Sequence, residues 1–394
     1  MGAVHGHDDE SYKPLQLAAG GQDGLYAWGN NTYDQLGIGS SSSSCSDPTI
    51  VPVQGISRVA CGWFHTLVVT EDGAMLAWGS NRSGQLGDGA SSEGTRGDRG
   101  SDGIAGVQTS EQQQSTLAHH PRIFFGHVLE VTAGDRHSLA ITDRGALLAW
   151  GHNGRGQLGD GTKQDRPCPM LILEGGVTGV AAGSTHSLAV LCSGEVLAWG
   201  ENASGQLGDG TQEQRSLPTG VFGLEEPVRK VAAGFAHSLA ITEKGQLFAW
   251  GDSRHGQLGI GQASGHQLKP RLVMAKGVVS AAAGKGHSLA STSDGKLYSW
   301  GENSLGQLGD GTATTRPLPV EILGKGVKEV GAGRAHSLAI TARGELLAWG
   351  DNEDGQLGLR APSPMPVAVL LHGVVAAAAG WSHTMALLAF HSPH

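Results

Sequence analysis

Apolar and polar residues alternate over short runs along most of the chain, and no stretch of useful length follows a helical period. The run His-Ser-Leu-Ala-Ile-Thr (336–341) is followed by Glu-Leu-Leu-Ala-Trp-Gly (345–350). A three-residue segment that ends in glycine, Ala-Arg-Gly (342–344), joins the two runs. Alternation with a period of two residues, interrupted by a glycine turn, predicts a β-hairpin.

Two further short runs flank each predicted hairpin. Val-Ala-Ala-Gly (231–234) is typical of the run before a hairpin, and Leu-Pro-Val-Glu (318–321) is typical of the run after it. Each unit therefore contains four short strands. Units of this kind, without helices between them, are typical of the blades of a β-propeller.

The unit occurs seven times, at a spacing of roughly fifty residues in most copies. Each copy contains Trp-Gly and then Gln-Leu-Gly, and its Leu follows its Trp by eight positions. A second signature is Gly-x-x-His followed by Ser or Thr. Its His precedes the next Trp by thirteen positions in the six copies where a Trp follows. The seven tryptophans are Trp28, Trp78, Trp150, Trp199, Trp250, Trp300 and Trp349. The seven histidines are His65, His137, His186, His237, His287, His336 and His383.

The two ends of the chain carry complementary halves of one unit. The first Trp copy has only Leu-Ala-Ala-Gly (17–20) before it, and the last His signature (380–384) has no Trp strand after it. Joining them completes a blade and removes two exposed sheet edges. We therefore expect an all-β, seven-bladed β-propeller with four-stranded blades, its ring closed by pairing of 374–388 with the strand that ends at Trp28. An open solenoid is the alternative, but it leaves both half-units unpaired.

One gap between signatures is longer than the others. From Leu86 to His137 the chain advances 51 residues, against 26 to 30 in the other six copies. The surplus is rich in Ser, Gly, Asp, Arg and Gln, which predicts a flexible insertion at about 90–116; a partner-contacting arm is the alternative. The predicted organisation is an N-terminal tail (1–16), a single propeller (17–389) and a C-terminal tail (390–394).

Composition narrows the classes of partner. The formal net charge is −9 and no run of Lys or Arg occurs, so we expect no nucleic acid to bind by direct electrostatics. No run of about 18 apolar residues predicts a membrane span, and residues 1–8 lack the apolar centre of a signal peptide. The four cysteines lie apart, without metal-ligand spacing, which favours reduced thiols and a cytoplasmic location: Cys45, Cys61, Cys168 and Cys192. His119-His120 and the pair His5 and His7 lack a third ligand, so no metal and no cofactor is expected.

The repeated motif resembles that of a known family. Trp-Gly-x-Asn-x-x-Gly-Gln-Leu-Gly with Ala-Gly-x-x-His-Ser-Leu-Ala is similar to the regulator of chromosome condensation repeat, over about 25–389. Two copies depart from it: Asp34 replaces the first Gly of Gly-Gln-Leu-Gly, and Ser253 replaces the Asn. The resemblance implies a seven-bladed propeller. It leaves the activity open, because members include a nucleotide exchange factor, a light sensor and an inhibitor.

Residues repeated in every copy are interpreted as scaffold. A His followed by Ser or Thr suggests a hydrolase, but a catalytic constellation occurs once per site, whereas this pair occurs seven times. We expect each histidine to form a hydrogen bond within or between blades, each tryptophan to fill the core, and each Asn and Gln to close a turn. No residue is predicted to be catalytic, and function must lie in what differs between copies.

The dipeptide inside Gly-x-x-His differs in every copy and precedes a strand, so all seven dipeptides should lie on one rim. The pairs in chain order begin with Trp63-Phe64 and Asp135-Arg136 and end with Trp381-Ser382. Ring closure makes Trp381 a neighbour of Trp63, which predicts an arc of aromatic and cationic side chains. Such groups are enriched in interaction hot spots; packing of each ring against its own blade is the alternative. The predicted partner-binding residues are Trp63, Phe64, Arg136, Phe235, Lys285, Arg334 and Trp381.

Three classes of function follow. The leading hypothesis is a scaffold propeller whose rim binds a protein partner; a small GTPase and a second copy of the chain are two candidates for it. Guanine-nucleotide exchange on, or regulation of, a small GTPase is the alternative that the resemblance implies. An enzyme with a pocket at the central channel, or an ultraviolet-B sensor, is less favoured. The rim copies lack the Arg of the sensor's Gly-Trp-Arg-His-Thr motif.

Overall fold

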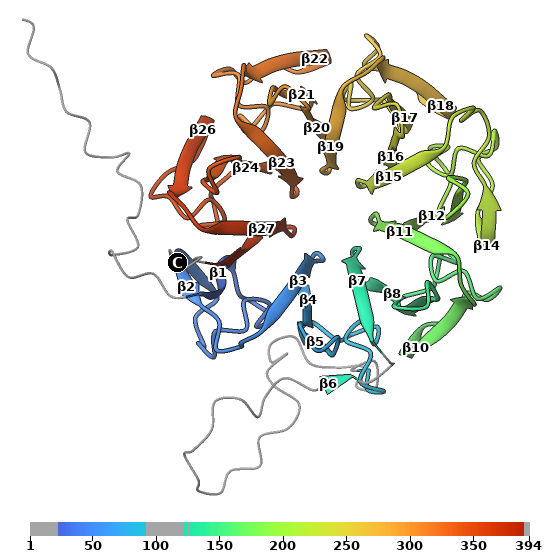
Figure 1. Cartoon of the computed structure of the whole chain (residues 1–394), viewed down its shortest axis with the longest axis horizontal. Coiled ribbons are helices and arrows are strands. Elements are labelled where there is room, and N and C mark those ends of the chain that lie inside the picture. Colours follow the sequence, from blue (N-terminus) through green and yellow to red (C-terminus); the bar gives the residue numbers. More distant parts are fainter. Residues whose placement is uncertain (1–22, 92–121, 124–126, 390–394) are drawn as a thin grey trace, which may run out of the picture.

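The computed structural model describes residues 23–91, 122–123 and 127–389, which form a ring of seven four-stranded antiparallel sheets (Figure 1). The predicted tails and nearly all of the predicted insertion at about 90–116 lie outside the described residues. All described regular secondary structure is β-strand. Within these residues there is no helix of the length and apolarity needed to cross a membrane.

Six blades use four consecutive strands, numbered from the innermost strand outward. They consist of β3 (Ile56–Cys61), β4 (His65–Thr70), β5 (Met75–Gly79) and β6 (Arg122–Ile123); β7 (Val128–Ala133), β8 (His137–Thr142), β9 (Leu147–Gly151) and β10 (Arg166–Leu173); β11 (Val177–Ala182), β12 (His186–Leu191), β13 (Val196–Gly200) and β14 (Arg215–Gly220); β15 (Val228–Ala233), β16 (His237–Thr242), β17 (Leu247–Asp252) and β18 (His266–Met274); β19 (Val278–Ala283), β20 (His287–Thr292), β21 (Leu297–Gly301) and β22 (Arg316–Leu323); and β23 (Val327–Ala332), β24 (His336–Thr341), β25 (Leu346–Gly350) and β26 (Ser363–Leu370).

The seventh blade is assembled from both ends of the chain, which confirms the predicted closure. Its strand order is β2 (Ser44–Ile50), β1 (Gly24–Asn30), β28 (His383–Leu388) and β27 (Val374–Ala379). Of the two C-terminal strands, only β28 pairs directly with β1, in a register that places Trp28 opposite Thr384. The strand β27 lies one position further in, where it pairs with β28 and lines the channel (Figure 1).

The core lies between neighbouring blades. The repeated tryptophans and leucines are almost fully buried, and Trp250 packs in one cluster with Leu207 of the preceding blade. Burial of such a large side chain contributes several kcal/mol relative to its loss. The prediction that the seven tryptophans fill the core is confirmed.

The departure at Asp34 coincides with an irregular blade. In the other copies the equivalent glycine has a positive φ and lies against the fourth strand of the next blade, and a Cβ at Gly256 would be 2.7 Å from the Cα of Pro317. Asp34 has φ +60°, and the fourth strand of the next blade is the two-residue β6, which pairs only with Met75 and Leu76. Among the described residues, Asp34 is the one non-glycine residue with a positive φ.

Closure of the ring by β27 and β28 leads to a testable prediction. Truncation before Gly373 removes β27 and β28 and leaves β1 without its partner strand, so we expect loss of cooperative unfolding or insolubility. Truncation after Ala389 removes only the predicted C-terminal tail and should leave the melting temperature unchanged. Differential scanning calorimetry on both proteins checks this, and a monomeric 1–372 protein that melts like the full chain would show that closure is dispensable.

Candidate functional site

The repeated Ser-His pairs join neighbouring blades. The Ser238 hydroxyl donates to the carbonyl oxygen of Gln206 at 2.8 Å, and the indole N–H of Trp250 donates to the same oxygen at 2.9 Å. His186 Nε2 lies 3.1 Å from Ser238 Oγ. Because the hydroxyl proton is used on the carbonyl, the imidazole must carry the proton on Nε2 and donate it to the serine oxygen.

The same arrangement occurs at all seven blade junctions, including the junction closed by Thr384 and Gln356. A hydrolytic serine must instead donate its proton to the histidine, and every one of these histidines is fully buried. The prediction that the histidines form hydrogen bonds between blades is confirmed, and the pairs form scaffold.

Burial keeps the histidines neutral. It lowers the pKa of His65 and His237 to about 3 and that of His186 to about 4. The Nδ1 atoms are buried and accept no hydrogen bond from the described residues. The glycine three positions before each histidine is required because no side chain fits beside the buried ring. A Cβ at Gly62 would lie 2.5 Å from His65 Nδ1 and 2.6 Å from the Gly134 carbonyl oxygen.

The predicted turn roles of Asn and Gln are also confirmed. Asn202 Oδ1 accepts from the amide of Leu207 at 3.0 Å, and Gln206 Oε1 accepts from the amide of Ser204 at 2.9 Å. Ser253 replaces the Asn in one copy, and its hydroxyl donates to the carbonyl of Gln262 at 2.9 Å. These turns and the Gly-x-x-His loops lie at the same end of each blade, and we call this end of the propeller the rim face.

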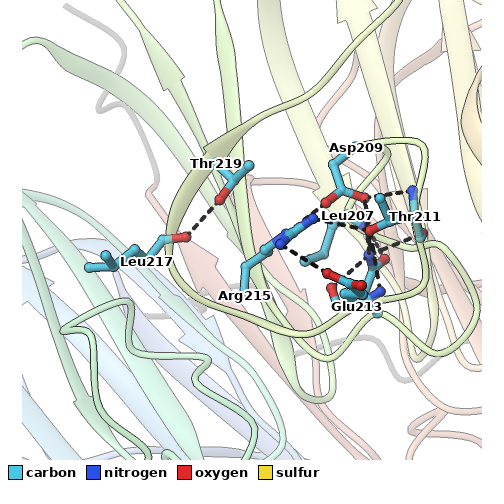
Figure 2. Close-up of polar contacts among 8 residues, drawn as sticks. Leu207, Asp209, Thr211, Glu213, Arg215, Leu217 and Thr219 are labelled. Carbon is cyan, nitrogen blue, oxygen red and sulfur yellow. Dashed lines mark hydrogen bonds and ion pairs between the residues drawn. The ribbon is translucent and has the colours of Figure 1, made fainter.

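Several arginines of the rim face are paired with carboxylates. Figure 2 shows one loop, in which Asp209 Oδ2 accepts from Arg215 Nε at 2.8 Å while Oδ1 accepts from the Thr211 amide and hydroxyl. These donors hold the pKa of Asp209 below its ordinary value, although burial opposes them. The same Asp-Gly-Thr loop pairs Asp160 with Arg166 and Asp310 with Arg316, each at 2.8 Å.

The variable first residues of the Gly-x-x-His loops gather at the mouth of the central channel. A cavity of about 80 Å³ lies there, and the Ala-Gly ends of the innermost strands form its walls. The predicted residues Phe64 and Arg136 do not line it, and Ser184 does so although it was not predicted. The mouth is lined by Trp63, Ser184, Phe235, Lys285, Arg334 and Trp381.

The aromatic side chains at the mouth pack against one another. The ring centroids of Trp63 and Trp381 are 3.6 Å apart, and the Arg334 guanidinium lies 5.4 Å from the Trp381 ring. Trp63 also stacks on Phe235 at 5.9 Å. Phe235 belongs to a blade three positions further along the ring, so this contact crosses the channel. Sequence spacing did not predict it.

The array continues outward over the rim face. Phe64 lies edge-on to Trp63 at 6.3 Å and to Tyr33 at 5.1 Å. The Arg82 guanidinium lies 5.4 Å from the Tyr33 ring. Tyr33 and Arg82 were missed from the sequence, although they occupy the variable positions between Asn and Gln. We call the five rings the aromatic cluster: Tyr33, Trp63, Phe64, Phe235 and Trp381.

Asp135 is a mostly buried acid on the rim face, and its amide donates to the carbonyl oxygen of Ser184 at 3.3 Å. Its side chain is 17% exposed, and its Oδ1 atom has no hydrogen-bond partner among the described residues. Burial raises the pKa of Asp135 to about 6, and Arg136 and His152 only partly oppose this. Arg136 Nε lies 3.9 Å from Oδ1, too far for a hydrogen bond, so the cost of burying this carboxylate is only partly offset. Among the described residues, no three His, Cys, Asp or Glu side chains are placed to hold a metal.

Comparison with known proteins places the chain in a family. Residues 171–391 match the RCC1-like domain. The chain belongs to the RCC1-like domain family. Single regulator of chromosome condensation (RCC1) repeats also match at 22–69, 56–85, 128–157 and 144–190, which confirms the resemblance drawn from the motif.

Curated relatives of this RCC1-like domain are diverse. The ultraviolet-B receptor UVR8 of Arabidopsis thaliana is 33% identical over 268 residues, which are 67% of this chain and 45% of that protein. The E3 ubiquitin-protein ligase HERC2 of Homo sapiens is 33% identical over 63% of this chain and 5% of its own length. The X-linked retinitis pigmentosa GTPase regulator of Mus musculus is 35% identical over 64% of this chain and 24% of its own length. The chain spans less than half the length of each.

Solved structures share the fold of this RCC1-like domain along the whole ring. Human WBSCR16 superimposes with a TM-score of 0.78 at 26% identity, covering 93% of this chain and 99% of the other. Prp20p from Saccharomyces cerevisiae, whose structure was described with its binding to Gsp1p and histones, superimposes with a TM-score of 0.78 at 23% identity. It covers 99% of this chain and 96% of its own.

The neutral histidines of the RCC1-like domain predict a strong dependence of its stability on pH. In the unfolded chain a histidine has a pKa of about 6.5, so unfolding takes up protons below that pH. Stability should be complete above pH 6.5 and should fall as pH decreases toward 4, by up to ~1.4 kcal/mol per pH unit for each histidine. Urea unfolding at several pH values measures this. A midpoint that stays constant between pH 6.5 and 5 would contradict the neutral assignment.

Asp135 predicts a dependence of the opposite sign. Its carboxyl is penalised when charged, so Asp135→Asn should stabilise the protein at pH 8, by on the order of 1–3 kcal/mol. The gain should shrink as pH falls from about 6 toward 4, because the acid becomes neutral in the folded state and the pH approaches its unfolded pKa of about 3.9. Urea unfolding of Asp135→Asn at both pH values checks this, with the exposed turn variant Asp143→Asn as control. Equal gains at pH 8 and pH 4 would count against it.

Proposed function

We propose that this propeller is a protein-binding module that holds its partner on the rim face, with the aromatic cluster as the centre of the contact. The single observation that carries the proposal is the position of that cluster. Its members come from the variable positions of the repeat, while the repeated residues around them are used for the scaffold. Large rings with cations beside them are the side chains that dominate protein interfaces.

The packing of the cluster supports this role. Trp63 and Trp381 rest on each other above the channel rather than inside a blade, and both remain partly exposed. Phe235 is 38% exposed. Rings that support one another lose little side-chain freedom when a partner covers them, which lowers the entropic cost of binding.

A small GTPase is one candidate for the partner. The observation that favours it is the 35% identity with the X-linked retinitis pigmentosa GTPase regulator of Mus musculus. A second copy of the chain is the other candidate. Sedimentation velocity tests self-association, and release of a fluorescent guanine nucleotide from a captured GTPase tests exchange or regulation.

The rim tryptophans provide the test. Trp63→Ala and Trp381→Ala should each weaken binding of the captured partner by about thirtyfold, equivalent to ~2 kcal/mol. The melting temperature should change little, because neither ring belongs to the core between blades. Affinity capture from the source cells identifies the partner, and titration of the purified pair gives the dissociation constants.

The control is Phe222→Ala, which removes an exposed ring that follows the outermost strand β14. It should leave both binding and stability unchanged. Normal partner binding by both tryptophan variants, or a marked drop in their melting temperatures, would make the cluster a packing element and place the binding surface elsewhere.

A further inference from the structure

Two cations stand side by side at the channel mouth. Lys285 and Arg334 occupy the same position of the repeat on adjacent blades, and the Lys285 amide donates to the Arg334 carbonyl oxygen at 3.3 Å. Lys285 is exposed and Arg334 is partly exposed. Both side chains line the same cavity as Trp63, Phe235 and Trp381.

These cations differ from the arginines farther out on the rim face. Arg155 pairs with Glu201 at 3.0 Å and Arg254 with Asp252 at 2.9 Å, as do the arginines of the Asp-Gly-Thr loops with their aspartates. Within the described part of the chain, Lys285 and Arg334 form no ion pair. The carboxylate of Glu302 on the Lys285 blade instead accepts from the Ser304 hydroxyl at 3.2 Å.

The charge at the mouth selects the class of ligand. An aromatic surface alone attracts cations, but one face of Trp381 is already covered by Arg334. A cationic ligand would also be repelled by Lys285. An anion gains attraction from both cations in a partly buried site, where salt and water screen the interaction less than at an open surface.

The mouth has room for a ligand group. Its volume of about 80 Å³ is several times the ~10–15 Å³ that one water molecule needs, so it can receive a side chain of a partner. A nucleic acid needs a stripe of cations along its backbone. This chain has a net charge of −9, and five arginines of the rim face are paired with carboxylates: Arg155, Arg166, Arg215, Arg254 and Arg316.

We propose that the rim face recognises an acidic peptide segment of a partner protein, which places one carboxylate between Lys285 and Arg334 and an apolar side chain on the exposed rings of Trp63 and Phe235. This inference rests on the proposed function and specifies the chemistry of the partner. The cations select the charge of the segment and the aromatic cluster supplies the apolar contact.

The experiment uses three fluorescein-labelled peptides: Gly-Glu-Glu-Trp-Glu-Glu-Gly and its counterparts with Gln or Lys in place of Glu. In fluorescence anisotropy with the full chain, the Glu peptide should bind at least tenfold more tightly than the Gln peptide, and the Lys peptide should not bind. Lys285→Glu and Arg334→Glu should each weaken binding of the Glu peptide at least tenfold. Raising the salt concentration should weaken it in the wild type.

Matched controls separate a local site from a general charge effect. Lys276→Glu and Arg343→Glu make the same charge reversals in loops at the opposite end of the blades, so they should leave binding unchanged. Equal affinity for the Glu and Gln peptides, or equal losses in the control variants, would overturn the proposal. Tighter binding of poly(U) RNA than of the Glu peptide would overturn it in favour of a nucleic-acid ligand.

The outcome is separable from that of the proposed function. If the Glu peptide fails to bind while Trp63→Ala still weakens binding of the captured protein, the rim face binds a partner of other chemistry and only the acidic-peptide proposal fails. If the rim tryptophan variants bind that protein normally, the proposed function itself fails.

Discussion

One backbone carbonyl in each copy of the repeat holds the ring together. The carbonyl of the Gln in Gln-Leu-Gly accepts from the indole of one residue and the hydroxyl of another, both on the next blade. That hydroxyl in turn accepts from a histidine of the first blade. Because each of these donors has its acceptor inside a buried interface at all seven junctions, removal of any one partner leaves a buried polar group without a bond. The repeated residues are therefore constrained, and the loops between them are free to vary.

The contrast between constrained repeated residues and variable loops explains which parts of the structure the sequence could predict. Trp-Gly, Gln-Leu-Gly and Gly-x-x-His have fixed spacing, and strand pairing follows directly from that spacing, so the blades and their closure were predicted from the sequence. Closure also placed Trp381 next to Trp63, which the ring contact confirms. Partner binding by the seven predicted residues stays a prediction.

Other features of the rim could not be predicted because they depend on the direction of side chains. Trp63 crosses the channel to Phe235, a contact between residues 172 positions apart that no local pattern specifies. Tyr33 and Arg82 join the array from a different loop of the repeat, so comparison of the Gly-x-x-His dipeptides alone did not find them. Asp135 was seen as a rim residue, but its burial depends on neighbours from other segments.

The blade assembled from β1, β2, β27 and β28 has a consequence for biosynthesis. The strand β1 is synthesised long before its partner β28, which begins more than 350 residues later. At ~5–20 residues per second, β1 must wait roughly 20–70 s for that partner. Throughout this interval its backbone donors and acceptors form an open edge, which other strands can pair with. Completion of the ring is thus a late, long-range event, and nascent chains that terminate early carry an aggregation-prone edge that the finished protein hides.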